Sequence, residues 1–463
     1  TGDITDSGAL AITGAATFIT GATGSNIVLD TSTNAFSNSV EMRADAGNEA
    51  FGNITFVDSA AIDFATSASS NGDLFINGST DGAVGGNLSV TATTGNITDT
   101  VALAVSGTTT LVTSANNATI ALNTTTNAFT GAVTITTNDD SGTDADVTID
   151  GGTTALIIAA STIDGDLTLT SDHASGITDS GTVTVGGNFT ATTDANSGVI
   201  NMGTMAVDGT VALTTNGTGA ATVVNDAGLN LAASTVGGAL SATATTGNIT
   251  DSGALAITGT TTLVTSADDA TITLDTTTNA FTGAVTITTN DSSGTDADVT
   301  IDGGTTALII AASTIDGDLT LTSDHASGIT DSGTVTVGGN FTATTDANSG
   351  VINMGTMAVD GSFTLAPNST GAVTIVNDAG LTLAASTMGG TFSGTATTGN
   401  ITDSGALAIT GTTTLVTSAN NATITLDTTT NAFTGAVTIT TNDDSGTDAD
   451  VTIDGGTTAL IIA

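Results

Sequence analysis

The chain has 463 residues, of which 45 are acidic and only one, Arg43, is basic, so its formal charge is −44. This charge excludes nucleic acid and anionic lipid as partners, because Lys and Arg are needed to bind phosphate groups. Cysteine is absent, which excludes disulfides and thiolate metal sites, and no apolar run is long enough to predict a helix inserted in a membrane. Abundant Thr and Val favour strands, and abundant Gly, Asn and Asp favour turns, so the composition predicts an all-β protein.

The chain opens on a short form of a motif that returns along its length. Residues 1–14 read TGDITDSGALAITG, and the related marker ATTGNITD places its glycine at Gly95, Gly247 and Gly399, which sets a period of 152 residues. Residues 141–209 are identical to residues 293–361. We therefore expect a divergent segment, two full repeat units and one partial unit, at 1–85, 86–237, 238–389 and 390–463.

A finer period lies inside each unit. In the second unit, glycine-led segments of 21 to 34 residues begin at Gly238, Gly259, Gly283, Gly317, Gly339 and Gly361. Residues 317–338 contain three short runs of alternating apolar and polar residues, separated by turn residues, which is the pattern of half-buried strands. Three strands per turn of about 22 residues predict a parallel β-helix, in which each turn buries its apolar side only by stacking on the next.

This hypothesis makes detailed expectations. We expect one continuous solenoid of roughly 18 turns, about 90 Å long at a strand spacing of about 4.8 Å, with the glycine-led segment starts lying over one another. Leu319, Phe341 and Phe363 should form one inward column. The segment 283–316 should be either one turn with an extended loop or an irregular pair of turns. An array of β-sandwiches is the alternative, but the chain lacks the core Trp or Tyr typical of immunoglobulin-like domains.

The segment starts GDLTLTS, GNFTATT and GNLSV, with turns such as SGITDSG, resemble the repeats of filamentous-haemagglutinin-type surface adhesins. The resemblance covers nearly the whole chain and rests on the style of the repeat. It implies a right-handed parallel β-helix that acts as an extracellular or cell-surface adhesive stalk or fibre. The chain differs from that family in its near absence of basic residues and in its long, nearly identical repeat.

One acidic stretch, TNDDSGTDADVTIDGG at 137–152, returns at 289–304 and 441–456. Aspartates two apart on a strand share one face, whereas Val147 and Ile149 should point into the core. Clustered carboxylates without a nearby cation suit Ca²⁺, although a solvated acidic face is the competing interpretation, and no calcium-binding nonapeptide or EF-hand loop is present. The candidate metal ligands are Asp144, Asp146, Asp150, Asp296, Asp298, Asp302, Asp448, Asp450 and Asp454.

The remaining motifs favour a structural role. The two histidines, His173 and His325, lie in equivalent SDHASG turns and are expected to be solvated, and no catalytic triad, phosphate loop or HExxH motif is present, so we predict that the protein is not an enzyme. Thr-x-Thr runs invite an ice-binding hypothesis, but Asp and Asn interrupt them. Several Asn-x-Thr sequons occur, at Asn96, Asn188, Asn248, Asn340 and Asn400.

The function that these features favour is an extracellular structural fibre or adhesin stalk of a microbial cell surface. The alternatives are a calcium-binding surface-layer protein and an ice-binding module. No cofactor is required, and Ca²⁺ is the one that the pattern admits. Both ends of the chain fall within the repeat, so we expect a longer protein or a filament in which copies pair. The expected partners are other copies of the chain, a host or neighbouring cell surface, and divalent cations.

Overall fold

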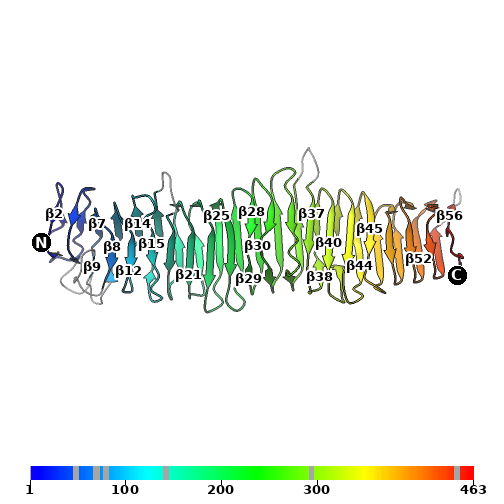
Figure 1. Cartoon of the computed structure of the whole chain (residues 1–463), viewed down its shortest axis with the longest axis horizontal. Coiled ribbons are helices and arrows are strands. Elements are labelled where there is room, and N and C mark those ends of the chain that lie inside the picture. The colour runs from blue at the N-terminus through cyan, green and yellow to red at the C-terminus, as the bar shows by residue number, and fades with distance from the viewer. Residues whose placement is uncertain are drawn as a thin grey trace. The chain divides into compact units, whose positions relative to one another are not determined.

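The computed structural model describes residues 2–44, 52–65, 73–76, 83–138, 145–290, 297–442 and 449–463. These residues form an all-β parallel solenoid of about 18 turns, as the repeat predicts, and contain no helix (Figure 1). Accordingly, none of them forms a helix with the length and apolar character that crossing a membrane requires. Two compact units share the chain: residues 1–227 with 236–238, and residues 228–235 with 239–463.

The strands are short, two to eight residues each. Those in residues 1–227 are β1 (Ile4–Thr5), β2 (Ala11–Ile12), β3 (Ala16–Ile19), β4 (Ile27–Leu29), β5 (Ala35–Phe36), β6 (Val40–Arg43), β7 (Ile54–Asp58), β8 (Ile62–Phe64), β9 (Asp73–Ile76), β10 (Ala83–Val84), β11 (Leu88–Ala92), β12 (Ile97–Asp99), β13 (Ala104–Val105), β14 (Thr109–Thr113), β15 (Ile120–Leu122), β16 (Ala128–Phe129), β17 (Val133–Thr136), β18 (Val147–Asp150), β19 (Leu156–Ile158), β20 (Ser161–Ile163), β21 (Leu167–Ser171), β22 (Ile177–Asp179), β23 (Val183–Val185), β24 (Phe189–Thr193), β25 (Ile200–Val207), β26 (Thr210–Thr214) and β27 (Ala221–Asn225).

The strands that follow are β28 (Leu229–Leu231), β29 (Ser234–Val236), β30 (Leu240–Ala244), β31 (Ile249–Asp251), β32 (Leu255–Ile257), β33 (Thr261–Thr265), β34 (Ile272–Leu274), β35 (Ala280–Phe281), β36 (Val285–Thr288), β37 (Val299–Asp302), β38 (Leu308–Ile310), β39 (Ser313–Ile315), β40 (Leu319–Ser323), β41 (Ile329–Asp331), β42 (Val335–Val337), β43 (Phe341–Thr345), β44 (Ile352–Val359), β45 (Ser362–Ala366), β46 (Val373–Asn377), β47 (Leu381–Leu383), β48 (Ser386–Met388), β49 (Phe392–Ala396), β50 (Ile401–Asp403), β51 (Leu407–Ile409), β52 (Thr413–Asn420), β53 (Ile424–Leu426), β54 (Ala432–Phe433), β55 (Val437–Asn442) and β56 (Val451–Ile453).

Each turn of the solenoid contributes one short strand to each of three faces. In the first unit, β11, β12 and β13 pair in parallel with β14, β15 and β16 of the next turn. In the second unit, β49, β50 and β51 pair in the same way with β52, β53 and β54. Parallel pairing of this kind requires a connection that returns to the starting edge, and here the other two faces of the turn provide it.

The expected inward column is confirmed. Leu319 pairs with Phe341, and Phe341 pairs with Phe363. All three side chains are fully buried, and the two phenylalanine rings meet edge to face with their centroids 5.8 Å apart. The three strands predicted in residues 317–338 are also present, as β40, β41 and β42. Alternation of apolar and polar residues therefore identified the core side of these strands correctly.

The expectation that all glycine-led segments start on one face is wrong. Val285 lies next to Thr261 on one face, but Leu319 lies next to Val299, which belongs to a different face. The cause is the long segment 283–316, which holds four strands, β36 to β39, and so makes more than one turn. In this segment β36 pairs with β38 and with β39 at one residue each, which is the irregular arrangement.

The glycines that begin many segments are required by close packing of successive turns. A Cβ atom built on Gly411 would lie 2.2 Å from the carbonyl oxygen of Gly390 in the preceding turn, and one on Gly435 would lie 2.3 Å from that of Gly411. No side chain fits at such a distance. Glycine therefore marks the corners at which the backbone of one turn rests directly on the next.

Three core positions carry threonine instead of an apolar residue. Thr109, Thr261 and Thr413 are almost fully buried, and their hydroxyl oxygens have no hydrogen-bond partner among the described residues. They occupy the same place in successive copies, and Thr413 lies between Phe392 and Val437 in its column. A buried hydroxyl without a partner destabilises the folded state by about 1–3 kcal/mol.

Replacing one of these threonines by valine should stabilise the protein. Thr261→Val keeps the shape of the side chain and removes the hydroxyl group, so we expect the free energy of unfolding in urea to rise by about 1 kcal/mol. Thr262→Val, at the outward-facing neighbour on β33, is the matched control and should change it by less than about 0.5 kcal/mol. A loss of stability in Thr261→Val would show that the buried hydroxyl makes a favourable interaction.

Candidate functional site

Polar side chains at one corner of the solenoid form ladders that join successive turns. In the second unit, a carboxylate oxygen of Asp298 accepts the backbone N–H of Asp318 at 2.8 Å. Asp318 in turn accepts the N–H of Asn340 at 2.6 Å, and the side-chain oxygen of Asn340 accepts the N–H of Ser362 at 3.0 Å. Asp146 begins the equivalent ladder in the first unit by accepting the N–H of Asp166 at 2.9 Å. These side chains satisfy backbone N–H groups at the corner, where the strand pairing stops.

The asparagines of the sequons belong to these ladders. The side-chain oxygen of Asn248 accepts the N–H of Thr271 at 2.9 Å, and that of Asn400 accepts the N–H of Thr423 at 2.8 Å. Asn96 and Asn188 make the same kind of contact. All of them are exposed. Their recurrence is thus explained by a structural role at the corner, whatever their use as glycan acceptors.

A second device joins an aspartate to an asparagine in the next turn, and we call it the Asp–Asn clamp. In the second unit, Asp251 accepts hydrogen bonds from the backbone of Asp275 at 3.2 Å and from the side-chain nitrogen of Asn279 at 2.7 Å. The side-chain oxygen of Asn279, which is 1 % exposed, accepts the N–H of Leu255 at 2.8 Å. The clamp recurs at the pairs Asp6–Asn34, Asp99–Asn127 and Asp403–Asn431.

The clamp was not foreseen from the sequence, although a signal was present. In every copy the aspartate of the ITD marker is followed 28 residues later by an asparagine. The functional importance of this spacing is invisible without the turn length, because 28 residues must first be known to exceed one turn by a few positions.

The candidate calcium ligands are distributed in two different places. Asp146 and Asp298 are ladder residues. Asp150, Asp302 and Asp454 each accept the N–H of the residue two positions on, at 2.7 Å. Asp146 and Asp150 share the outer side, with Val147 and Ile149 buried between them as predicted, but a strand separates residues four apart by about 13 Å.

Asp450 lies exposed next to β56, whereas Asp144, Asp296 and Asp448 lie outside the described residues. Within the described ranges, no group of three or more acidic or histidine side chains is arranged to hold a metal ion. Since three of the nine candidates lie outside those ranges, calcium binding by this stretch stays a prediction.

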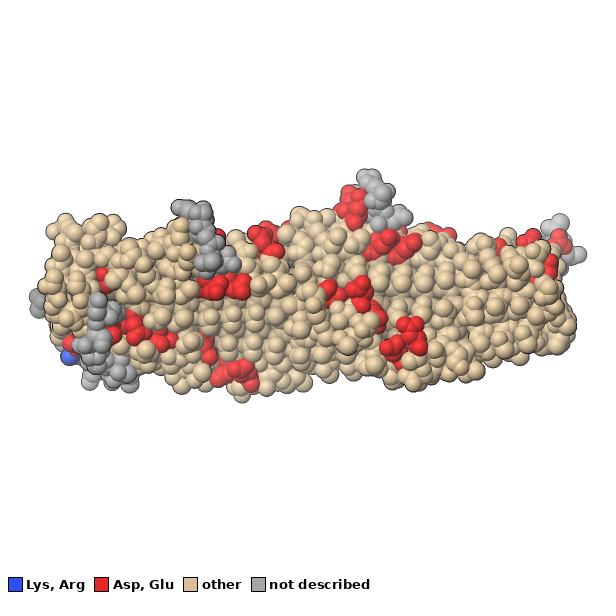
Figure 2. All heavy atoms as spheres, in the orientation of Figure 1, with Lys and Arg blue, Asp and Glu red and all other residues tan. Residues whose placement is uncertain are grey.

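Asp150 and Asp302 occupy a corner that collects negative charge. Burial raises the pKa of the Asp150 carboxyl above its ordinary value near 3.8, and the carboxylates of Asp172, Asp194 and Asp99 raise it further against the opposing hydrogen bond from Gly152. The pKa of Asp302 is raised by burial and by its own neighbouring aspartates in the same way. Figure 2 shows carboxylates gathered in short clusters, with wide areas free of charged atoms between them.

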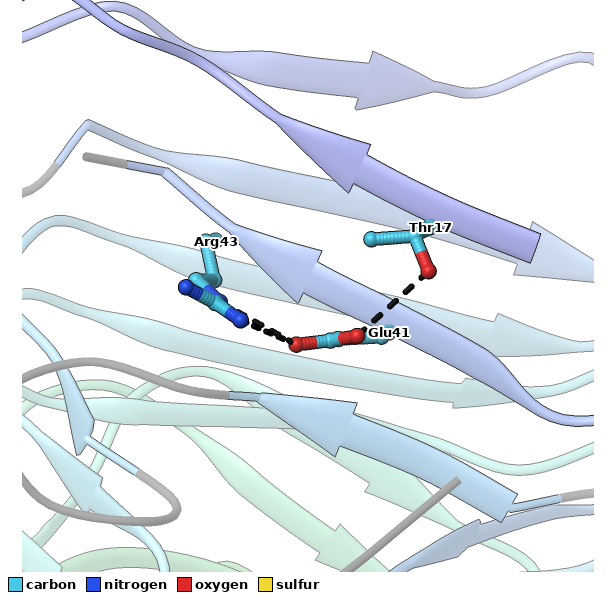
Figure 3. A network of polar contacts seen from close by, with 3 residues as sticks. All are labelled: Thr17, Glu41 and Arg43. Atoms are coloured by element: carbon cyan, nitrogen blue, oxygen red, sulfur yellow. Dashed lines mark hydrogen bonds and ion pairs between the residues drawn. The ribbon is translucent and has the colours of Figure 1, made fainter. Parts of the chain in front are cut away.

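The histidines and the single arginine have local partners. The Nδ1 atom of His173 accepts the N–H of Ser175 at 3.0 Å within its own turn, and His325 does the same with Ser327. Arg43 forms an ion pair with Glu41 at 2.9 Å on β6, and Thr17 donates to the other oxygen of Glu41 (Figure 3). These contacts describe turn and surface stabilisation and supply no constellation for catalysis.

A family model described as Repeats of unknown function (DUF5649) matches residues 1–43, 51–136, 218–288, 296–360 and 370–440, which is more than half of the chain. No curated protein and no solved structure matches the chain. The matches return along the chain, in agreement with the tandem repeats and with a solenoid built from them.

The Asp–Asn clamp should be essential at neutral pH. Asn279→Asp places a second carboxylate against Asp251 and removes its donor, so we expect a loss of about 3 kcal/mol in the free energy of unfolding, reduced in acid as the carboxyls protonate. Asn290→Ala, at an exposed asparagine, is the control and should cost less than about 1 kcal/mol. Urea unfolding at several pH values would test this, and equal effects of the two substitutions would contradict the structural role of the clamp.

The raised pKa values of Asp150 and Asp302 predict a pH-dependent contribution to stability. A carboxyl with a raised pKa binds its proton more tightly in the folded state, so it lowers stability at neutral pH and this cost disappears as pH falls towards the unfolded pKa. The double substitution Asp150→Asn and Asp302→Asn keeps the acceptor oxygens, and should raise the melting temperature at pH 7 but change it little near pH 4.

Asp6→Asn provides a control of opposite sign. Partial burial opposes ionisation of Asp6, but hydrogen bonds from Asn34, Thr31 and Asp30 outweigh it and lower the pKa. This substitution should therefore reduce the melting temperature at pH 7, with a smaller effect in acid as the carboxyl of the original protein is protonated. Melting curves of both variants that show the same shift at every pH would contradict these assignments.

Proposed function

The chain belongs to the family described as Repeats of unknown function (DUF5649), and from this premise we propose that it is an extracellular structural fibre or adhesin stalk of a microbial cell surface. Tandem repeats in a β-solenoid fit a structural repeat protein. Such a protein presents its flanks along its length and requires no catalytic residues.

The recurrence of the Asp–Asn clamp is the observation that carries this proposal. The same contacts join Asp99 to Asn127, Asp251 to Asn279 and Asp403 to Asn431, one in each copy. A further copy would reuse these contacts and would need no new interface. Duplication of the 152-residue unit is therefore a simple way to lengthen the solenoid, and this accounts for long stretches of identical sequence better than a binding or catalytic role does.

The location and the partners follow from stability and charge. Ladders and clamps stabilise the turns without disulfides, which suits a protein exposed outside the cell, where few other factors maintain it. The negative charge would oppose side-by-side association of copies at low ionic strength, and divalent cations would reduce that repulsion. We propose other copies of the chain, or the surface of a host or neighbouring cell, as partners.

Deleting one repeat unit tests the structural role. Removal of residues 238–389 joins Gly237 to Gly390 and recreates the Gly-Gly dipeptide that occurs at both borders. We expect the variant to fold with unchanged β-sheet content per residue, and its largest dimension in small-angle scattering to decrease by the length of one copy. Removal of the same number of residues from 250 onwards breaks the register less cleanly at its junction and should be less stable, so equal unfolding of both deletions would contradict the modular role.

The location requires a separate experiment on the native source. Antibodies against the chain should label the outside of intact cells in immunogold electron micrographs. Protease treatment of intact cells should remove the label, provided that the protease does not require basic residues, because trypsin could cut only after Arg43. Labelling confined to the cell interior would overturn the extracellular proposal and leave the solenoid architecture untouched.

A further inference from the structure

A groove of about 290 Å³ lies on the flank of the second unit, beside β44 and β46. Thr334, Thr356, Val376, Asp378 and Thr397 supply its side chains. Val376 faces outward from its strand between two buried residues, so its side chain provides an apolar surface, which the methyl groups of the threonines extend. The groove thus combines a small apolar surface with oxygen atoms.

A β-bulge creates this groove. The register between β44 and β46 shifts between Met354 and Met357, which leaves an extra residue in β44. Asp331 holds the bulged segment by accepting the N–H groups of Gly355 at 2.9 Å and Thr356 at 2.6 Å. Bulges of this kind redirect side chains and are common beside functional sites. Here the bulge turns Thr356 outward, where it is exposed.

The hydroxyl hydrogens of two groove threonines are already used. The hydroxyl of Thr356 donates to the carboxylate of Asp331 and to the carbonyl oxygen of Gly333. The hydroxyl of Thr397 donates to the carbonyl oxygens of Asn377 and Asp378. Both hydroxyl oxygens retain lone pairs that face the groove as acceptors. A ligand that contacts them must therefore bring hydrogen-bond donors.

Asp378 is the charged group of the groove, and its carboxylate is not used by the fold. The residue is exposed, and its backbone N–H donates to the carbonyl oxygen of Met357 at 2.9 Å. Its carboxylate makes no hydrogen bond or ion pair with any residue in the described ranges, in contrast to Asp331, Asp251 and Asp298, which bind backbone N–H groups. The side chain is available to a cation.

We propose that this groove binds the side chain of a lysine from a partner protein. An ammonium group has three donors and no acceptor, which matches a site whose polar atoms are the carboxylate of Asp378 and the acceptor oxygens of Thr356 and Thr397. The methylene stem would lie on Val376 and the threonine methyl groups. The chain holds one basic residue, Arg43, so the lysine comes from a different protein.

The sequence of the preceding copy carries the same residue types at the corresponding positions, which are Thr182, Thr204, Val224, Asp226 and Thr245. Repetition of a weak site along a repeat protein raises the overall affinity for a partner with several lysines through effective concentration. The proposal goes beyond the structural role proposed above, since it assigns a binding property to the flank and depends on neither the location nor the length of the protein.

The test uses the full chain with isotope-labelled valine methyl groups and Nα-acetyl-lysine methylamide as the probe. We expect a saturable shift of the Val376 methyl signals with a dissociation constant in the millimolar range, as for other exposed ion pairs, and weaker binding at high salt. The uncharged norleucine analogue should bind at least about fivefold more weakly. An amino sugar serves as a second probe, and stronger binding of the sugar than of the lysine compound would overturn the assignment of a protein partner.

Asp378→Asn separates a specific site from general attraction to a negative protein. This substitution keeps the shape of a side chain that has no partner in the fold, so the melting temperature should be unchanged and the affinity should fall by about fivefold. Asp360→Asn, at an exposed aspartate after β44, is the matched control and should leave the Val376 shift unaltered. Equal affinity in Asp378→Asn and in the original protein, or no saturable shift at all, would overturn the proposal.

Discussion

The structure depends on the contact between one turn and the next. A single turn of this solenoid has three strands of a few residues each and cannot cover its own apolar side chains, so every turn relies on two neighbours. Parallel pairing between turns fixes the height of each residue, and side chains of one kind then fall into columns. The fully buried column of Leu319, Phe341 and Phe363 is one consequence, and the close approach of Gly390 and Gly411 is another.

The acidic composition is understood more easily from this contact than from a ligand. Many aspartates accept backbone N–H groups at corners, where strands end and the backbone lacks partners, and charged acceptors form stronger hydrogen bonds than neutral ones. Asp251 and Asp298 illustrate two versions of this role. A carboxylate is an acceptor only, so it cannot substitute for the asparagine of the clamp, which donates to Asp251 and accepts from Leu255. Residues of both kinds are therefore needed at each corner.

The same division separates structural carboxylates from those open to partners. Asp331 is occupied by the bulge that it stabilises, whereas Asp378, on the same flank, faces the groove. A solenoid of repeated turns can carry such grooves at fixed intervals without altering the core, because outward and inward residues alternate along each strand. The proposed structural role and the proposed lysine site are compatible for this reason, and each can fail without the other.

The sequence by itself determined the class of fold, the repeat and the core side of the strands. Alternation in residues 317–338 and glycines at 21- to 34-residue intervals are local patterns, and such patterns suffice when every turn repeats the same solution. The tertiary structure alone decided which face each segment occupies, since the four strands of residues 283–316 change the phase of the turns that follow. It also decided the partners of the aspartates. Asp146 and Asp150 look alike in sequence as candidate ligands, yet one supports the next turn and the other its own loop, because hydrogen-bond partners between turns depend on register, and register depends on the length of every connecting loop.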